Sequence, residues 1–266
     1  MNYHNLAYTD VAIAAALILV NGLVSLLLKL QLERQLLWAS LRTITQLLAI
    51  GYLLGWVFQH AQWYIVLPLM LSMTLIAGFS AAGRGQLRHR GQLADSVLSV
   101  GLSAWLVTAI GLFVVLRVRP WYEPQYAIPI LGMILGNTLT AVALGIDRMT
   151  RELSAQRPVV DMILSLGGTR WEAARAAASQ ALKAGMMPTL NQMSVVGIVS
   201  LPGMMTGQIL AGQQPGDAVR YQIVIMFLIA AASALGTVCA VLMTFNRLFS
   251  PGHQFMAHKL ARRRHH

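Results

Sequence analysis

Few side chains in this sequence could do chemistry, and their spacing favours docking over catalysis. The seven histidines and the single cysteine, Cys239, are scattered along the chain, and no histidine has a partner at catalytic spacing. The chain also has no phosphate-binding glycine loop and no clustered metal ligands. Most of the mid-chain charge lies in one segment, which reads RPVVDMILSLGGTRWEAAR from Arg157 to Arg175. We therefore expect that the chain is not an enzyme and binds no cofactor, so that any energy source would belong to another polypeptide.

The charged segment lies within residues 147–187, which are predicted to form a compact cytoplasmic hairpin of two helices. Pro158 suits a first helical turn, because its φ is already helical and the N–H that it lacks would be unsatisfied there. Gly167 and Gly168 then predict a left-handed helix stop. The alternative is a solvated loop that only connects two membrane spans, but such a loop has little need of Trp171. The hairpin is therefore a candidate docking element.

The second helix of the hairpin is predicted to begin at Thr169. Thr169 and Glu172 have the spacing of a capping box, in which the hydroxyl and the carboxylate each accept a hydrogen bond from a backbone N–H of the first turn. An alanine-rich run continues to Ala184. Gly185 and Pro188 then predict a break before the next membrane span.

The composition places these elements in a membrane protein. Of the 266 residues, 56% are hydrophobic and 11% are charged, which is too apolar for a soluble domain of this length. Crossing the hydrocarbon layer takes about 20 helical residues. We predict an all-α, polytopic transmembrane helix bundle of about seven spans that forms a single domain over residues 1–266. The predicted spans are Val11–Leu28, Ser40–Phe58, Trp63–Ala82, Ser96–Leu116, Ala127–Ile146, Pro188–Leu210 and Tyr221–Phe245.

The basic residues predict how this bundle is oriented. With the amino terminus outside, all but three of the 20 Lys and Arg residues fall on the inner side, the exceptions being Arg117, Arg119 and Arg220. This pattern predicts an N-out, C-in protein of the cell inner (plasma) membrane, with the hairpin in the cytoplasm. The formal net charge of +11 then needs no nucleic acid as a partner. The terminal ARRRHH is expected to meet anionic membrane lipid.

Polar and flexible residues inside the predicted spans are candidates for a translocation pathway. A side-chain amide in hydrocarbon needs a partner or a wet cavity, and a proline next to a glycine predicts a bend in the sixth span. Methionine thioethers are soft ligands that suit Cu(I), but adaptable packing around a moving hinge is the better interpretation of these methionines, and the metal ligands stay unknown. Interhelical packing is the alternative role for the amides. The pathway candidates are Arg42, Gln46, Met133, Asn137, Pro202, Gly203, Met204, Met205 and Gln208.

Four stretches resemble the Fet-type iron-export permeases of bacterial ABC transporters, a family whose plant relatives are the aluminium-tolerance permeases. They lie at Leu41–Tyr52, Ile128–Asn137, Leu164–Thr169 and Val199–Gly207, and the run SLPGMMTG within the last is the most specific. The resemblance implies export of iron by a homodimer, with ATP and Mg²⁺ bound by a separate ABC ATPase subunit.

The hairpin also looks like the glycine-centred loop by which ABC permeases dock their ATPases. Asp161 stands where that loop usually has Glu, and Met162 and Ile163 stand where it has two alanines. By this resemblance the ATPase-coupling residues are Asp161, Leu164, Leu166, Gly167, Gly168, Thr169, Trp171 and Glu172.

Two alternatives remain open at this point. The plant relatives have been linked to nucleotide-sugar export, so an anionic sugar nucleotide is the second possible cargo, with Arg42 as a contact. A stand-alone secondary transporter is the other alternative. It would usually need an intramembrane carboxylate or histidine, and the predicted spans contain neither.

Overall fold

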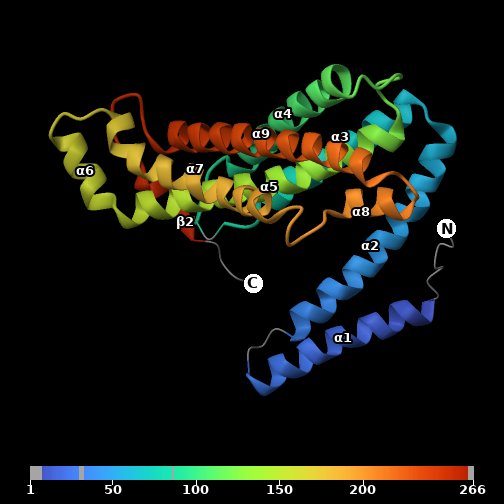
Figure 1. The fold of residues 1–266 in the computed structure, drawn as a ribbon. Coiled ribbons are helices and arrows are strands. Elements are labelled where there is room, and N and C mark those ends of the chain that lie inside the picture. Colours follow the sequence, from blue (N-terminus) through green and yellow to red (C-terminus); the bar gives the residue numbers. More distant parts are fainter. Residues whose placement is uncertain (1–7, 30–32, 86, 263–266) are drawn as a thin grey trace. The chain divides into compact units, whose positions relative to one another are not determined.

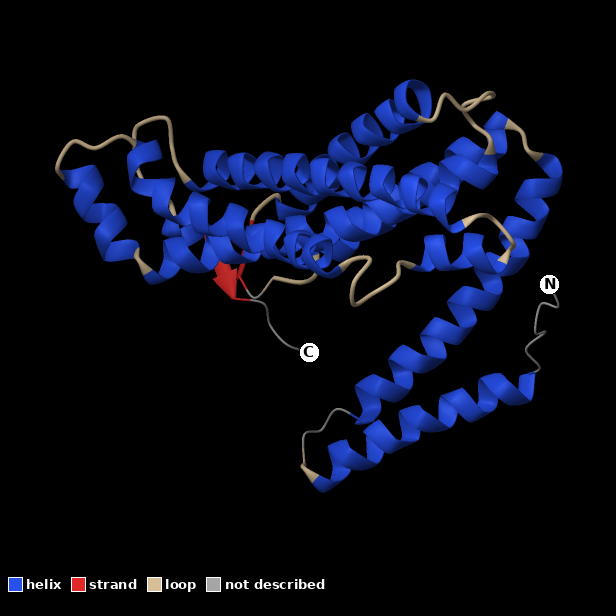
Figure 2. Ribbon diagram, viewed as in Figure 1, coloured by secondary structure: helices blue, strands red, loops and turns tan. Residues whose placement is uncertain are grey.

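A computed structural model describes residues 8–29, 33–85 and 87–262 of the chain (Figure 1). The described part is helical apart from one small antiparallel pair of strands, which confirms the all-α class (Figure 2). In chain order the elements are α1 (Tyr8–Leu27), α2 (Glu33–His60), α3 (Trp63–Ala82), β1 (Leu87–His89), α4 (Gln92–Ile110) with a π-helical turn (Gly111–Val115), α5 (Pro124–Ala155), α6 (Arg157–Ser165), α7 (Arg170–Val195), α8 (Gly203–Leu210), α9 (Pro215–Leu248), a 3₁₀ turn (Ala257–Lys259) and β2 (Leu260–Arg262).

The chain divides into two compact units, each of which is described by itself. The first holds α1 and α2 with residues 210–212, and the second holds α3 to α7, most of α8, and α9. In the first unit α1 packs against α2, and the Ser25 hydroxyl donates to the Glu33 carboxylate over 3.0 Å. Most of the apolar side chains of this helix pair are exposed, for example Leu17 and Leu47. The pair therefore presents an apolar surface suited to lipid or to another protein.

The second unit is built around α5, which packs against α3, α4, α7 and α9. Its core contains many small and hydroxyl-bearing residues, and these let the helix backbones approach closely. Gly145 on α5 and Gly185 on α7 both face Thr237 of α9: a Cβ at either glycine would lie 2.8 Å or 2.6 Å from the Thr237 methyl carbon. Thr237 itself is fully buried. At these three residues α5, α7 and α9 pack closely together.

Five helices in the described part of the chain are long and apolar enough to cross a membrane. They are α2, α3, α4 with its π-helical turn, α5 and α9. The first predicted span corresponds to α1, in which the described side chains form a shorter apolar stretch, Ala15–Leu27. Residues 1–7 and 263–266, which include most of the basic tail assigned to lipid contact, lie outside the described residues. The total of seven spans and their orientation therefore stay predictions.

The sixth predicted span, Pro188–Leu210, is wrong as a single helix. The expected break at Gly185 and Pro188 does not occur, because α7 runs through both to Val195. The missing side chain of Gly185 serves packing instead, since a Cβ there would lie 2.8 Å from the Ala141 carbonyl oxygen of α5. The second helix of the hairpin is therefore a long one. The interruption comes later, over residues 196–202, as a complete break rather than the expected bend at Ser200 to Gly203.

We predict that Gly145→Ala destabilises the protein, although alanine is the better helix former by about 1 kcal/mol. The added methyl would meet the Thr237 methyl at 2.8 Å in a core with no room to yield, and such overpacking costs about 1–3 kcal/mol. Thr237→Ser removes the opposing methyl, so Gly145→Ala should be neutral or stabilising in that background. Gly136→Ala is the control on the same helix, because nothing lies within 4 Å of its Cβ position. Thermal unfolding in detergent compares the four members of this double-mutant cycle. Equal effects of Gly145→Ala in the wild-type and Thr237→Ser backgrounds would contradict the proposed clash.

Candidate functional site

The predicted hairpin is present, and its turn is formed by residues 166–169, which we call the glycine corner. Pro158 lies in the first turn of α6, as predicted. Gly167 has a φ of 85° in the left-handed region, which confirms its role as the helix stop. Its N–H donates to the Leu164 carbonyl over 3.1 Å, and the Gly168 N–H donates to the Ile163 carbonyl over 2.9 Å. Two of the last carbonyls of α6 are thereby satisfied at a sharp turn.

The capping box at the start of α7 is also confirmed. The Glu172 N–H donates to the Thr169 hydroxyl oxygen over 3.3 Å, and the Thr169 N–H donates to the Glu172 carboxylate over 2.7 Å. The Thr169 hydroxyl also donates to that carboxylate over 2.8 Å. These hydrogen bonds lower the pKa of the Glu172 carboxyl below its usual value, since they favour the charged form. The corner is thus closed by local hydrogen bonds on both sides.

We predict that the first turn of α7 loosens in acid. Because the pKa of Glu172 is lower in the folded corner, the carboxylate's stabilisation is fully present above its usual pKa and is lost as pH falls through the lowered value. Hydrogen–deuterium exchange of the first-turn amides, corrected for the intrinsic rate at each pH, measures the loss. Glu172→Gln keeps an acceptor without a charge, so its exchange should not vary over the same pH range. The same acid response in Glu172→Gln would contradict the assignment.

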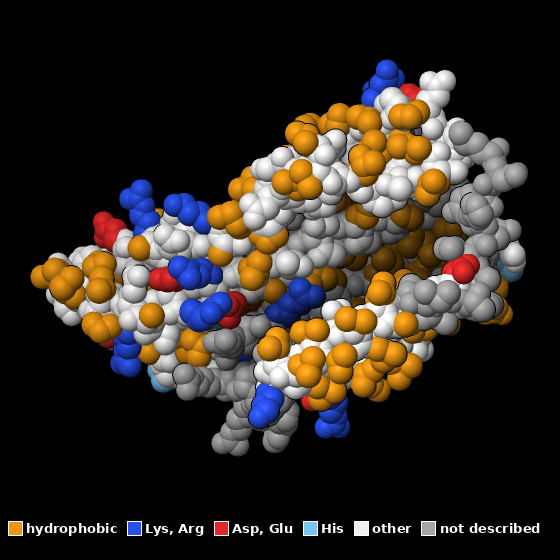
Figure 3. All heavy atoms as spheres, turned by 60° about the horizontal axis from the view of Figure 1, so that its bottom comes forward, with side chains coloured by type: hydrophobic (Ala, Val, Ile, Leu, Met, Phe, Trp, Pro, Cys, Tyr) orange, Lys and Arg blue, Asp and Glu red, His pale blue; other side chains and the backbone are white. Residues whose placement is uncertain are grey.

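The coupling residues divide into an outward and an inward set. Leu166 is 81% exposed and Met162 55% exposed, although both are large and apolar. Trp171 is exposed as well, and Asp161 lies beside them with its carboxylate paired to Arg157 over 3.4 Å. Figure 3 shows hydrophobic side chains gathered at the α6 end of the molecule, with charged side chains nearby. We call Met162, Leu166 and Trp171 the exposed apolar patch.

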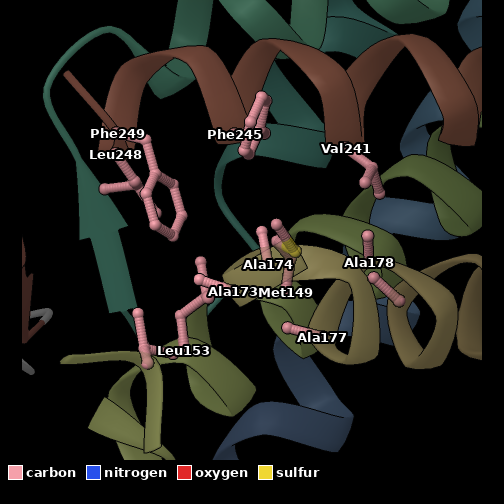
Figure 4. Close-up of a cluster of buried hydrophobic side chains, with 12 residues drawn as sticks. Met149, Leu153, Ala173, Ala174, Ala177, Ala178, Val241, Phe245, Leu248 and Phe249 are labelled. Carbon is pink, nitrogen blue, oxygen red and sulfur yellow. The ribbon is translucent and has the colours of Figure 1, made fainter. Parts of the chain in front are cut away.

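The inward set packs against a cluster of buried side chains drawn from α5, α6, α7 and α9 (Figure 4). Ile163 and Leu164 of α6 pack against this cluster. Phe245 of α9 stands edge-on to Trp171, with ring centroids 5.4 Å apart, and the Arg170 guanidinium lies 5.3 Å from the Phe245 ring. The corner is thus held against the ends of α5 and α9. The members of the buried cluster are Met149, Leu153, Val160, Ala173, Ala174, Ala177, Ala178, Ala181, Val241, Phe245, Leu248 and Phe249.

A buried ionic group that the sequence did not predict lies beside the end of α9. No partner is expected for any histidine, but Nε2 of His89 lies 2.9 Å from the Asp95 carboxylate. The second oxygen of Asp95 lies 3.3 Å from Nη2 of Arg247. Asp95 was placed just outside the fourth span, whereas α4 begins earlier, at Gln92, and includes it. The short spacing from His89 to Asp95 was visible in the sequence, but Arg247 is 152 residues further on and gave no signal.

The pathway candidates lie in both units: two on α2 in the first unit, and the others on α5 and around α8 in the second. Arg42 and Gln46 are exposed on α2 in the first unit. On α5, the Asn137 amide donates to the Met133 carbonyl over 2.9 Å, which satisfies it within its own helix. The other candidates lie at the interrupted segment: Pro202 directly precedes α8, and α8 contains Gly203, Met204, Met205 and Gln208.

Of these, Met205 alone contributes to a groove of ≈ 550 Å³ between the end of α7, the interrupted segment, α8 and α9. Met193 and Met226 also line this groove, as does the buried side chain of Gln222. The Oε1 atoms of Gln208 and Gln222 find no hydrogen-bond partner among the described residues. The other side chains that line the groove are apolar, and its methionines come from three parts of the chain. Within the described ranges, no three His, Cys, Asp or Glu residues gather as a metal site.

Comparison with known proteins gives one family and several full-length relatives. The model of an uncharacterised protein family, UPF0014, matches residues 8–249. A UPF0014 membrane protein from Synechocystis is 38% identical over 85% of this chain and 88% of its own length. The probable iron export permease protein FetB of Escherichia coli is 33% identical over 99% of this chain and 100% of its own. The protein ALUMINUM SENSITIVE 3 of Arabidopsis thaliana is 30% identical over 93% and 89%. No solved structure matches the chain.

Proposed function

Because the chain belongs to the UPF0014 family of multi-pass membrane proteins, we propose that it is the transmembrane permease subunit of an ATP-driven ABC exporter of iron. In this proposal a separate ABC ATPase subunit binds ATP and Mg²⁺ and docks at the glycine corner. Two copies of the chain form the translocation unit in the cell inner membrane. The predicted topology, with seven spans and the amino terminus outside, puts the corner in the cytoplasm where ATP is available.

The glycine corner and its exposed apolar patch carry the proposal. Leu166 projects from a turn that is fixed on both sides, by the left-handed Gly167 and by the capping box of Thr169. A rigid turn that exposes large apolar side chains among charged ones suits a protein interface, since such anchors bind with little loss of conformational entropy. The buried cluster behind it links the corner to α5 and α9. A force applied at the corner would therefore reach two of the candidate spans.

Iron as the cargo is supported by the name of the Escherichia coli relative rather than by a built metal site. The methionines of the apolar groove are soft ligands, and ferrous iron prefers imidazole and carboxylate. Iron would then cross by transient contacts in a wet pathway between two copies, or as a complex. A nucleotide sugar remains the alternative cargo, and its negative charge would favour a contact with Arg42.

One observation bears on a secondary transporter, the alternative function. The structure places Asp95 within α4 and pairs it with His89, and both are groups that can carry a coupled proton. Arg247 also pairs with Asp95 at that end of the helix, and a fixed positive charge stabilises the ionised carboxylate. A buried carboxylate paired with a permanent positive charge suits a structural role better than proton transport.

The test is reconstitution of the purified chain in liposomes with its genomic-neighbour ATPase. ATP hydrolysis is measured during titration with ferrous iron and, separately, with a nucleotide sugar. Stimulation by iron would support both the ABC transporter assignment and iron as the cargo. Stimulation by the sugar alone would support the ABC transporter assignment with a nucleotide sugar as the cargo. An ATPase that neither binds the chain nor responds to either compound would remove the ABC assignment.

A further inference from the structure

The tail after α9 folds back as a tight turn. Phe249 and Phe255 pair as an isolated antiparallel bridge, and the residues between them read Ser-Pro-Gly-His-Gln. The Ser250 N–H donates to the Gln254 carbonyl over 2.9 Å, and the His253 N–H donates to the Ser250 carbonyl over 3.2 Å. Pro followed by Gly favours such a turn. His253 leaves it with a φ of 55°, in the left-handed region.

The turn delivers a hydrogen-bond acceptor to the first turn of α7. The Arg170 N–H donates to Nδ1 of His253 over 2.9 Å. The nearby amides of Thr169 and Glu172 are satisfied within the capping box. Because the first amides of a helix have no partner inside it, His253 adds a cap that the box leaves out. Nδ1 accepts only when the ring is neutral and carries its proton on Nε2.

Packing holds the same turn against the corner. Phe255, Phe249 and Phe245 form a row of rings with successive centroids 5.3 Å apart, and Phe245 continues it to Trp171. Further along, the Met256 N–H donates to the Leu248 carbonyl over 2.8 Å, and β2 pairs with β1. The turn is therefore fixed at both ends. The match to the family model ends at residue 249, so the turn follows directly after the matched region.

We propose that His253 is a positioning residue, which ties the first turn of α7 to the end of α9 so that a movement of the bound ATPase at the glycine corner is transmitted to that helix. This inference rests on the proposed function. Without the His253 bond the rings still attach the tail, and Trp171 and Arg170 still contact Phe245 of α9, but packing alone then holds the first turn of α7 against α9. Binding of the ATPase and transmission of its movement would then separate: binding stays, and transmission weakens.

Three variants distinguish the effect of the hydrogen-bond acceptor at residue 253 from the effect of its left-handed backbone conformation. His253→Asn keeps an acceptor and tolerates the left-handed φ, whereas His253→Gly keeps the φ and removes the acceptor. His258→Gly is the matched control, because His258 is exposed on the same tail. Exchange of the α7 first-turn amides is measured in the purified full-length chain. ATPase binding and substrate-stimulated hydrolysis are then measured with the genomic-neighbour ATPase.

We expect His253→Gly to speed exchange of the first-turn amides roughly five-fold, the effect of one net hydrogen bond. It should lower stimulated hydrolysis while ATPase binding stays unchanged. His253→Asn and His258→Gly should both behave like the wild type. Unchanged exchange in His253→Gly, or faster exchange with full stimulation, would overturn the inference. Failure of the wild-type chain to bind the ATPase would instead count against the proposed function. The exchange data would still show whether His253 caps the first turn of α7.

Discussion

Leu166→Glu is expected to weaken binding of the ATPase subunit by about 30-fold or more while leaving the permease folded. Leu166 is 81% exposed, so its replacement removes little packing from the free chain, and surface changes of this kind alter stability by only about 0.5 kcal/mol. At the centre of an interface, by contrast, the loss of a large apolar anchor costs about 2 kcal/mol or more. Binding of the separately purified ATPase to the chain in detergent measures the effect.

The control for charge is Ser154→Glu, which adds the same carboxylate to the exposed end of α5 without removing apolar surface. Leu166→Met is the conservative control and should retain binding, because it keeps a large apolar side chain at the turn. If Leu166→Glu bound the ATPase as tightly as Ser154→Glu, the exposed apolar patch would not be the docking surface. A loss of binding in both would indicate a response to charge alone.

The corner could be predicted from the sequence because its signals are local. Pro158, the glycine pair and the spacing from Thr169 to Glu172 each report a conformation fixed within one turn of helix. The sequence could not predict the length of α7. A glycine in a sequence can indicate either the end of a helix or a position where a neighbouring helix packs closely. Gly185 is of the second kind, because α5 and α9 lie against it.

The candidate site was predictable to the same extent. The coupling residues lie in one segment, so their proximity follows from the hairpin alone. The pathway candidates come from α2, α5 and α8, and their grouping would depend on tertiary contacts that periodicity does not encode. Met205 is placed in the apolar groove with Met193 and Met226, neither of which was a candidate. The cap from His253 to Arg170 joins residues 83 positions apart and was equally out of reach.

The buried ionic group leads to the second large prediction, that Asp95→Ala lowers the free energy of unfolding by about 1–3 kcal/mol, because the buried His89 loses its partner while the half-exposed Arg247 can be hydrated. The Asp95 side chain is 3% exposed and accepts from both His89 and Arg247, so its removal leaves two polar groups without their partner. The matched control is Asp217→Ala. Its pair with Arg220 is largely exposed, and such pairs contribute about 1 kcal/mol or less.

Thermal unfolding in detergent, followed by loss of the monodisperse fraction, compares the two variants. Should Asp95→Ala fail to insert, Asp95→Asn still gives a reading, because the amide keeps one acceptor oxygen and should lose less stability than alanine. A loss for Asp95→Ala no larger than that for Asp217→Ala would mean that the buried group does not stabilise the fold. The expected larger loss would instead show that the buried group holds β1, α4 and α9 together at the end of α9 that also packs against the corner.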